Sequence, residues 1–209
     1  MEPDSDTTLI SRARHGDETA FATLVDRYKD ALINYLRHLT RSHERAEEIA
    51  QDAFVRLYRC RTDRWKSESL GPYLFRIATN VVVSQIRRER RWRLLLPMFA
   101  ATQPVSEATA DRRLVTSEIQ DKVTAALERL PVKLRAPLVL FEIEEWPYHE
   151  IAKALGCRIG TVKSRIFRAR ALMRKDLESW WIGENHERNR NWECDAAAAA
   201  NDSVASIHV

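Results

Sequence analysis

The sequence predicts an all-α protein in which a flexible linker joins two helical domains, an N-terminal helical bundle and a C-terminal helix-turn-helix. Glycine is scarce, at 5 of 209 residues, and apolar residues recur at helical spacing over long stretches. The stretch 148–175 is the most specific, because two amphipathic segments there flank a turn that contains a glycine. The hydrophobic content of 44% is enough for packed cores.

Composition narrows the class of protein. The net charge is +4 and the isoelectric point about 9.1, and no segment approaches the roughly 18 apolar residues that cross a bilayer. The acidic N-terminus lacks an apolar signal core, so export is not expected. Three widely spaced cysteines indicate a reducing cytoplasm. His186 and Cys194 lack the further pair that a zinc site needs.

The first helices of the chain read as a bundle. Thr7 or Thr8 can cap a first helix, and a second follows the break at 16–17 and continues to about residue 39. Ser42 begins a third helix, whose N-terminal half is rich in acids. Its buried stripe leaves a mixed face that either faces solvent or docks on a protein: Glu48, Gln51, Asp52, Val55 and Arg56.

Residues 60–72 form a polar connection that contains Trp65 and Lys66. An aromatic residue there either plugs the core or stacks on an unpaired base. The helix predicted over 73–91 buries one side and carries a second stripe within about 80° of arc: Tyr73, Arg76, Asn80, Ser84 and Arg87. These side chains suit stacking, base-edge hydrogen bonds and phosphate contacts, or else form a solvated polar face. An arginine cluster surrounds the nearby Trp92.

Residues 94–113 contain two prolines and no helical pattern, which predicts the linker. The domains are therefore expected over 1–93 and 114–182. Helical periodicity resumes over 114–130 and again over 133–144, and Pro147 opens the next helix. The tail 183–209 has no sustained amphipathic stripe and is expected to be weakly ordered.

The stretch 148–175 has the pattern of a helix-turn-helix. Gly156 lies where a helix end needs a left-handed backbone. In the second helix one stripe packs inward, formed by Val162, Ile166, Ala169 and Met173. The outward face carries Lys163, Ser164, Phe167 and Arg168. Residues 159–175 hold six Lys or Arg and no acid. An apolar ring held outward among cations favours DNA reading over a merely solvated face.

These segments together resemble the extracytoplasmic-function sigma factors of the sigma-70 family. The resemblance covers roughly 9–177 and is most specific at LGCRIGTVKSRIFRARALMRKDL, which is close to the family's region four. ERAEEIAQDAFVRLYR and WKSESLGPYLFRIATNVVVSQIRR look like region two. The resemblance implies a bacterial initiation factor that binds core RNA polymerase and promoter DNA, and that an anti-sigma factor holds inactive.

The resemblance also implies roles for individual residues. Core polymerase would contact Glu48, Gln51, Asp52 and Arg56. The minus-ten element, as single-stranded bases, would contact Trp65, Lys66, Tyr73, Arg76, Asn80 and Arg87. The minus-thirty-five element, as duplex, would contact Arg158, Thr161, Lys163, Ser164, Phe167 and Arg168. Three departures from the family pattern leave the promoter sequence open: Ser84, Glu145-Trp146-Pro147 and Arg158.

Two other functions compete with this interpretation. A stand-alone helix-turn-helix regulator would bind duplex DNA as a dimer, but no ligand-pocket signature or receiver-like acidic triad supports it. An enzyme is not expected, because the sequence offers no nucleophile–base pair, glycine-rich phosphate loop or metal cluster. No cofactor and no small-molecule substrate is therefore predicted.

Overall fold

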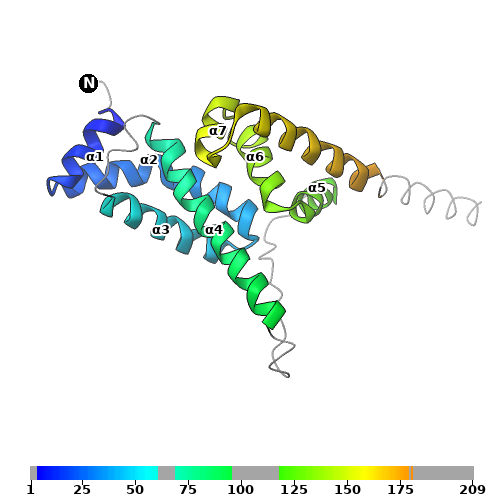
Figure 1. The fold of residues 1–209 in the computed structure, drawn as a ribbon. Helices are drawn as coiled ribbons and strands as arrows, with labels where there is room; N and C mark the ends of the chain where they lie inside the picture. The colour runs from blue at the N-terminus through cyan, green and yellow to red at the C-terminus, as the bar shows by residue number, and fades with distance from the viewer. Residues whose placement is uncertain (1–3, 61–68, 96–117, 179, 181–209) are drawn as a thin grey trace, which may run out of the picture.

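The computed structural model describes residues 4–60, 69–95, 118–178 and 180. Throughout these ranges the secondary structure is helical, which confirms the all-α prediction (Figure 1). The helices are, in order, α1 (Asp6–Arg14), α2 (Glu18–Thr40), α3 (His43–Arg59), α4 (Leu70–Leu95), α5 (Glu118–Arg129), α6 (Val132–Glu142), α7 (Tyr148–Leu155) and a last helix over 159–178.

Side-chain caps fix where the first three helices begin. Ser5 caps α1 by accepting a hydrogen bond from the Thr8 amide, so the predicted cap at Thr7 or Thr8 was wrong by two or three residues. Asp17 caps α2, and the pKa of this carboxyl falls to about 2 because Thr19, the Ala20 amide and Arg12 donate hydrogen bonds to it. Ser42, at which a helix was predicted to begin, caps α3.

The core of the first half lies between α2, α3 and α4. Tyr35 and Phe75 are its largest fully buried side chains, and their ring centroids lie 5.2 Å apart. The Tyr35 hydroxyl is 2.8 Å from the Thr79 hydroxyl, which donates to the Phe75 carbonyl. Both of these buried hydroxyls therefore have hydrogen-bond partners.

In the second half, α5, α6, α7 and helix 159–178 surround a smaller core. Pro131 precedes α6, and Pro137 lies inside it. Ile119 and Val123 lie within the segment 114–130 whose helical periodicity the sequence indicated, but they are 61% and 40% exposed. They are exposed because they line an open groove.

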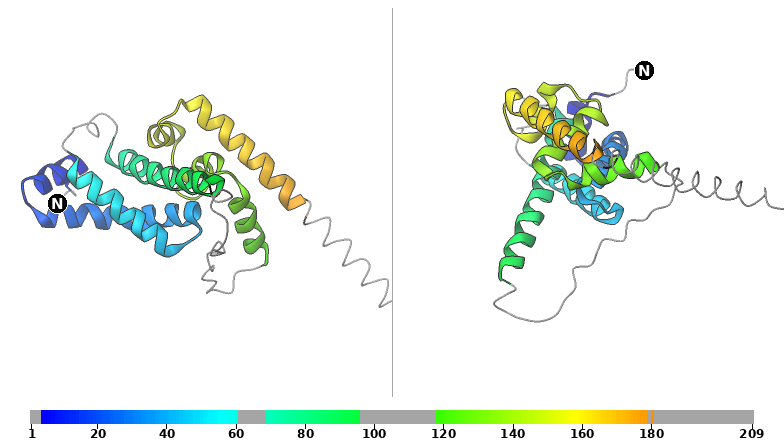
Figure 2. Two further views of the ribbon diagram at one scale, coloured as in Figure 1. Left: turned by 60° about the horizontal axis from the view of Figure 1, so that its bottom comes forward. Right: turned by 90° about the vertical axis from the view of Figure 1, so that its right-hand side faces the viewer.

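The two halves pack against each other. Helix α4 lies along α7, and α2 contacts α6, as the views in Figures 1 and 2 show. The C-terminal turns of α4 extend beyond this packed region (Figure 2). Residues 94 and 95 of the predicted linker are the end of α4. The rest of that linker and the tail 183–209 lie outside the described residues.

Candidate nucleic-acid interface

The helix-turn-helix is formed by α7, the turn 156–158 and helix 159–178. Gly156 ends α7 with a φ of 58°, the left-handed conformation that the sequence predicted. Val162 and Ala169 are completely buried, Ile166 is 2% exposed, and Met173 packs partly against the same core. This inward stripe fixes the rotation of helix 159–178 and so determines which residues face outward.

The residues predicted for duplex DNA lie on the outward face of helix 159–178 and, for Arg158, in the turn just before it. Phe167 is 75% exposed, and Arg158, Lys163, Ser164 and Arg168 are also exposed, whereas Thr161 is half-buried. The Ser164 hydroxyl donates to the Thr161 carbonyl at 3.0 Å. Its lone pairs therefore remain available to a donor from outside the helix.

An aromatic pair supports the base of this face. The rings of Phe141 and Tyr148 stack with centroids 4.8 Å apart and an interplanar angle of 7°. The ammonium of Lys163 lies 5.6 Å from the Tyr148 ring, and the guanidinium of Arg170 lies 5.3 Å from the Phe141 ring. Arg170 also pairs with Glu142 at 2.5 Å. Sequence analysis missed this platform, although the aromatic residues frame the segment before the turn.

Helix α4 bears the second predicted face, and the structure divides it. Asn80, Ser84 and Arg87 are exposed and continue along one side. Tyr73 is 9% exposed, with its hydroxyl 3.2 Å from the Cys60 sulfur. The half-buried Arg76 covers the Tyr73 ring at 5.1 Å. Treating all five as one exposed stripe was therefore wrong for Tyr73, because α4 begins inside the core.

The remaining residues predicted for single-stranded DNA, Trp65 and Lys66, lie outside the described residues. Near the end of α4, Arg88, Arg90 and Arg91 are exposed and Trp92 is 61% exposed. Glu89 pairs with Arg45 of α3 at 2.7 Å. This ion pair joins the third and fourth helices close to the point where α4 leaves the bundle.

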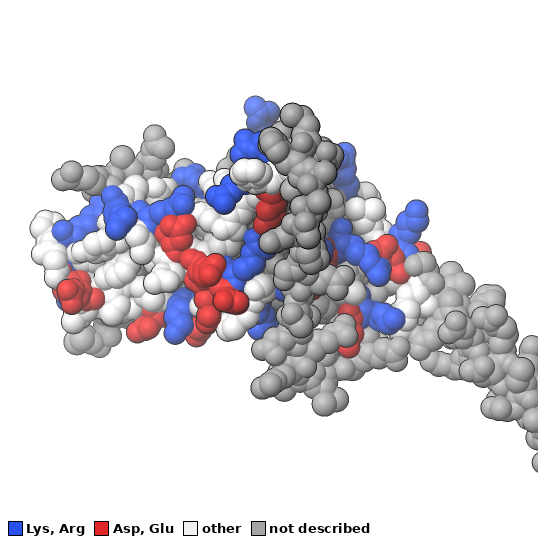
Figure 3. All heavy atoms as spheres, turned by 90° about the horizontal axis from the view of Figure 1, so that it is seen from below, with Lys and Arg blue, Asp and Glu red and all other residues white. Residues whose placement is uncertain are grey.

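The outward face of α3 mixes charge and apolar surface. Asp52 and Arg56 form a two-contact ion pair at 3.0 and 2.9 Å, and both are well exposed. Tyr58, which the sequence analysis did not single out, is 47% exposed beside Val55 at 39%. Viewed from below, acidic side chains gather over this part of the molecule with basic ones near them (Figure 3). Exposed aromatic and branched residues between charges are typical of a protein-docking surface.

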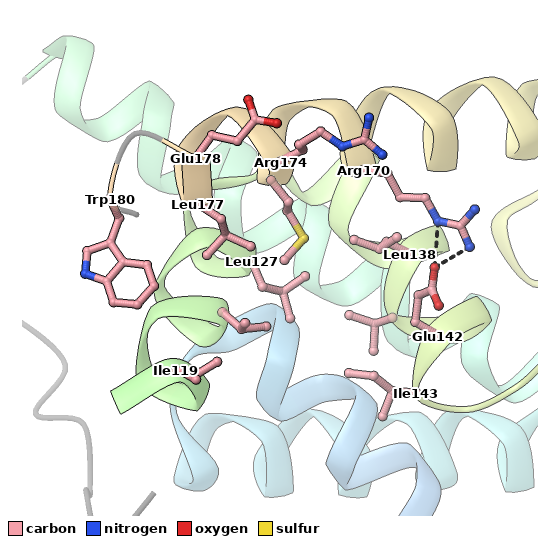
Figure 4. Close-up of a pocket in the computed structure, with 13 residues that line it drawn as sticks. Ile119, Leu127, Leu138, Glu142, Ile143, Arg170, Arg174, Leu177, Glu178 and Trp180 are labelled. Carbon is pink, nitrogen blue, oxygen red and sulfur yellow. Dashed lines mark hydrogen bonds and ion pairs between the residues drawn. The ribbon is translucent and has the colours of Figure 1, made fainter. Parts of the chain in front are cut away.

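The second half also contains an apolar groove that the sequence did not predict. Its cavity of about 760 Å³ lies between α5, α6 and helix 159–178, and Trp180 stands at one end (Figure 4). Its walls are mainly apolar, with Ile119, Leu127, Leu138 and Leu177 turned toward the opening. Ile119 and Leu127 fall in the segment 114–130, whose helical periodicity the sequence indicated, but periodicity alone does not distinguish a core from a groove.

The described residues contain no group of three or more His, Cys, Asp or Glu that is placed to hold a metal ion. His186 and Cys194, which the sequence analysis considered as zinc ligands, lie outside the described residues. No helix in the described ranges combines the length and apolar character needed to cross a membrane.

The fold and these faces define a helical DNA-binding protein with a helix-turn-helix reader and a separate polar helix face. Two family models match the chain: Sigma-70 region 2 over residues 24–92 and Sigma-70 region 4 over residues 120–173. The chain belongs to the sigma-70 family, among the extracytoplasmic-function (ECF) RNA polymerase sigma factors.

Relatives support this placement. The ECF RNA polymerase sigma factor SigW of Bacillus subtilis is 34% identical over 177 residues, which cover 80% of this chain and 94% of the relative. The ECF RNA polymerase sigma-E factor of Escherichia coli is 32% identical over 175 residues, covering 79% and 91%. The presence of both regions in one chain supports a sigma factor over a stand-alone regulator.

Two solved structures have a similar fold. The sigma factor RpoE from Bartonella quintana, in complex with the anti-sigma factor NepR, has a TM-score of 0.58 and 25% identity, covering 76% of this chain and 96% of that one. CnrH in complex with the cytosolic domain of CnrY has a TM-score of 0.61 and 26% identity, covering 84% and 99%.

Proposed function

We propose that this sigma factor uses its first half to bind core RNA polymerase and minus-ten DNA, and its second half to read minus-thirty-five DNA. The single observation that carries the proposal is the outward set around Phe167 on a helix whose other side is locked into a core. The domains would be 1–93 and 114–182, with 94–113 between them. The polymerase would catalyse RNA synthesis, so the chain itself would not act as an enzyme. It would act in the cytoplasm, with the polymerase.

The duplex reader consists of the exposed face of helix 159–178. Lys163 and Arg168 supply positive charge to phosphates or base edges, and Phe167 supplies an apolar contact of the kind that suits a thymine methyl. The cation–π contact with the Tyr148 ring restricts the conformations of the Lys163 side chain. Arg170 contributes less, since Glu142 already neutralises it.

Single-stranded DNA would bind along the exposed side of α4. Asn80 offers an amide for base edges and Arg87 a charge for phosphates, together with Trp65 and Lys66 of the preceding connection. Tyr73 would act indirectly, because its buried ring holds in place the Arg76 guanidinium that covers it. Stacking on an aromatic residue returns about 1–3 kcal/mol per base, which helps offset the cost of strand opening.

The α3 face, with Glu48, Gln51, Asp52 and Arg56, would dock on core polymerase. The exposed Val55 and Tyr58 give this charged surface an apolar centre. An anti-sigma factor is the proposed inhibitor, and the apolar groove of the second half offers a site for one of its helices. Of the two structural relatives, RpoE is bound to the anti-sigma factor NepR and CnrH to the cytosolic domain of CnrY.

Transcription by the purified chain with core polymerase tests the whole proposal. We expect specific initiation from a subset of promoters in a genomic library. Lys163→Ala and Arg168→Ala should each weaken upstream duplex binding, whereas Arg170→Gln is a matched control on the same helix. Unchanged transcription in the first two variants, or an equal loss in the control, would contradict the duplex assignment.

Two further variants separate the roles within the first half. Asn80→Ala should impair strand opening, measured by permanganate reactivity, more than formation of the closed complex. Asp52→Lys should reduce copurification with core polymerase, while Asp30→Lys, at an exposed position on α2, should not. Equal loss at both stages of initiation, or normal copurification of the Asp52 variant, would count against these faces.

A further inference from the structure

Within the described residues, the apolar groove of the second half is left open to solvent. Ile119 and Val123 of α5 and Ile143, just after α6, line it, and each is at least 40% exposed. Branched aliphatic side chains are usually buried. A contiguous apolar surface of this kind marks a binding site rather than a simple boundary of the fold.

Two contacts place the end of the fold at this groove. Trp180 stands at one end of it (Figure 4), and the ammonium of Lys122 in α5 lies 5.5 Å from the centroid of the Trp180 ring. Arg129, the last residue of α5, pairs with Asp176 at 3.6 Å. Both contacts join α5 to the end of helix 159–178. The tail 183–209 therefore begins three residues beyond a side chain that lines the groove.

Within the tail, residues 192–204 have a composition that suits an apolar groove. The segment begins with Trp192 and contains the run Ala196–Ala200. A buried tryptophan is a strong anchor at protein interfaces. Alanine has the highest helix propensity and loses no side-chain freedom in a helix. The run therefore lowers the entropy cost of ordering the segment when it binds.

The charges of this segment and of the groove are opposite. The segment carries three acids and no Lys, Arg or His. On the groove wall Arg170 is paired with Glu142, whereas Arg174, one turn further along the helix, is exposed (Figure 4). Lys122 adds a second cation near the end of the groove. The lining residues include one further acid, Glu178, so the rim keeps a net positive charge.

The tail is also long enough to fill the groove. Helix α5, which forms one wall, has 12 residues and is about 18 Å long. A helix over 192–204 would have a similar length of about 20 Å. The connection 181–191 reaches up to roughly 40 Å when it is extended. The segment can therefore enter the groove in either direction.

We propose that residues 192–204 bind the apolar groove in the free protein and thereby compete, within the same chain, with any partner helix that binds there. The occupancy rests on the features above, whereas the competition rests on the proposed function, in which an anti-sigma helix uses this groove. A short flexible tether gives an effective concentration on the order of 1 mM. A segment that binds with a dissociation constant of about 0.1 mM then occupies the groove roughly nine-tenths of the time and weakens an external ligand about tenfold.

Photo-cross-linking in the full chain tests the occupancy. The photoreactive residue p-benzoylphenylalanine replaces Val123 on the groove wall or, as a control, Ala22, an exposed residue of α2. Trypsin cleaves after Arg190, so the cross-linked product carries the peptide 191–209. We expect this product from position 123 in at least about fivefold higher yield than from position 22. An equal mixture of ¹⁴N- and ¹⁵N-labelled protein shows by mass spectrometry whether the product forms within one chain.

A charge swap tests the register of the segment on the groove wall. Arg174→Glu should lower the yield from position 123 at least about threefold, because it sets a carboxylate against the acidic segment. Adding Glu193→Lys and Asp195→Lys should restore the yield. Since the combined variant keeps Arg174→Glu, its recovery also shows that this substitution does not unfold the second half.

A peptide measures the competition. The fluorescein-labelled peptide of residues 192–204 is titrated in an anisotropy assay with the full chain and with a full-length variant carrying Trp192→Ala, Glu193→Lys and Asp195→Lys. The variant's own segment no longer fits the groove, so the peptide should bind the variant about tenfold more tightly than the unaltered chain. A peptide carrying the same three changes is the control and should not bind.

Four results would overturn the inference. The first is a product that is no more abundant from position 123 than from position 22. The second is a product that forms mainly between chains, which would make a second copy the occupant. The third is a yield that Arg174→Glu leaves unchanged or that the tail substitutions fail to restore, and the fourth is equal peptide affinity for both chains. None of these measurements uses DNA or polymerase, so a failure to initiate transcription would refute the proposed function separately.

Discussion

Replacing Arg135 with methionine should lower the free energy of unfolding by about 2–4 kcal/mol. Its side chain is 4% exposed, and it donates to four backbone carbonyls, those of His38 and Leu39 in the first half and of Glu128 and Leu130 in the second. The Glu128 carbonyl keeps a second donor in Arg41, and each of the other three buried carbonyls left without a donor costs about 1 kcal/mol or more. Water reaching the vacated position sets the lower end of the range.

Burying the guanidinium charge of Arg135 is itself unfavourable. This cost limits how much the substitution lowers the free energy of unfolding. Desolvation lowers the pKa of the Arg135 guanidinium to about 10, with the nearby Arg41 lowering it further and Glu128 raising it. Its Nε has no hydrogen-bond partner among the described atoms. Methionine keeps most of the apolar stem but removes the desolvated charge, so the loss should not reach the upper end of the cost of a broken buried ion pair, which is about 3–5 kcal/mol.

Urea unfolding followed by circular dichroism measures the change. Arg41→Gln is the matched control, because Arg41 also donates to the Glu128 carbonyl but is well exposed. Its cost should not exceed about 1 kcal/mol. If Arg135→Met costs less than about 1 kcal/mol, or no more than the control, the carbonyls do not depend on Arg135 and the reasoning fails.

Other predictions concern single positions. Glu145 has a φ of 55°, so Glu145→Gly should raise the melting temperature by relieving about 1 kcal/mol of strain; a lower melting temperature would contradict this. Ser42→Ala should cost about 1 kcal/mol in urea unfolding through loss of the α3 cap, and no change would remove that role. Phe167→Ala should weaken cognate duplex binding by about 1–3 kcal/mol in an anisotropy titration without changing the melting temperature. The control Leu172→Ala, at an exposed position on the same helix, should not weaken duplex binding. Burial, aided by two arginines, lowers the pKa of His38; stability should therefore be complete above about pH 6.5 and fall as the pH drops toward the lowered value. A pH series on His38→Gln should lack that fall, and an unchanged profile would exclude His38 as its source.

The sequence predicted the elements that depend on local pattern. The Gly156 turn, the inward stripe of helix 159–178 and the start of α3 at Ser42 all follow from spacing and side-chain chemistry along a few residues. The outward position of Phe167 followed from the same stripe. These features need no knowledge of distant parts of the chain, which is why pattern analysis recovered them.

What the sequence did not reveal depends on pairing across the chain. Tyr73 was placed on an exposed stripe, but the start of α4 is enclosed by other helices, so periodicity did not give its burial. The contact between Phe75 and Trp146 joins positions far apart in the sequence, and no local pattern encodes it. The roles of the DNA- and polymerase-facing residues remain predictions that the proposed variants test.

The C-terminal end of helix α4 projects from the bundle. Its 26 residues extend about 39 Å, and Ile86 is the last described side chain that packs against the core, so the turns after it project by about 14 Å. The Arg45–Glu89 ion pair joins the first of these turns to α3. A tilt of about ten degrees at Ile86 would shift the end of α4 by about 2–3 Å. Small adjustments in the bundle would thereby displace this end by a large part of one base-pair rise.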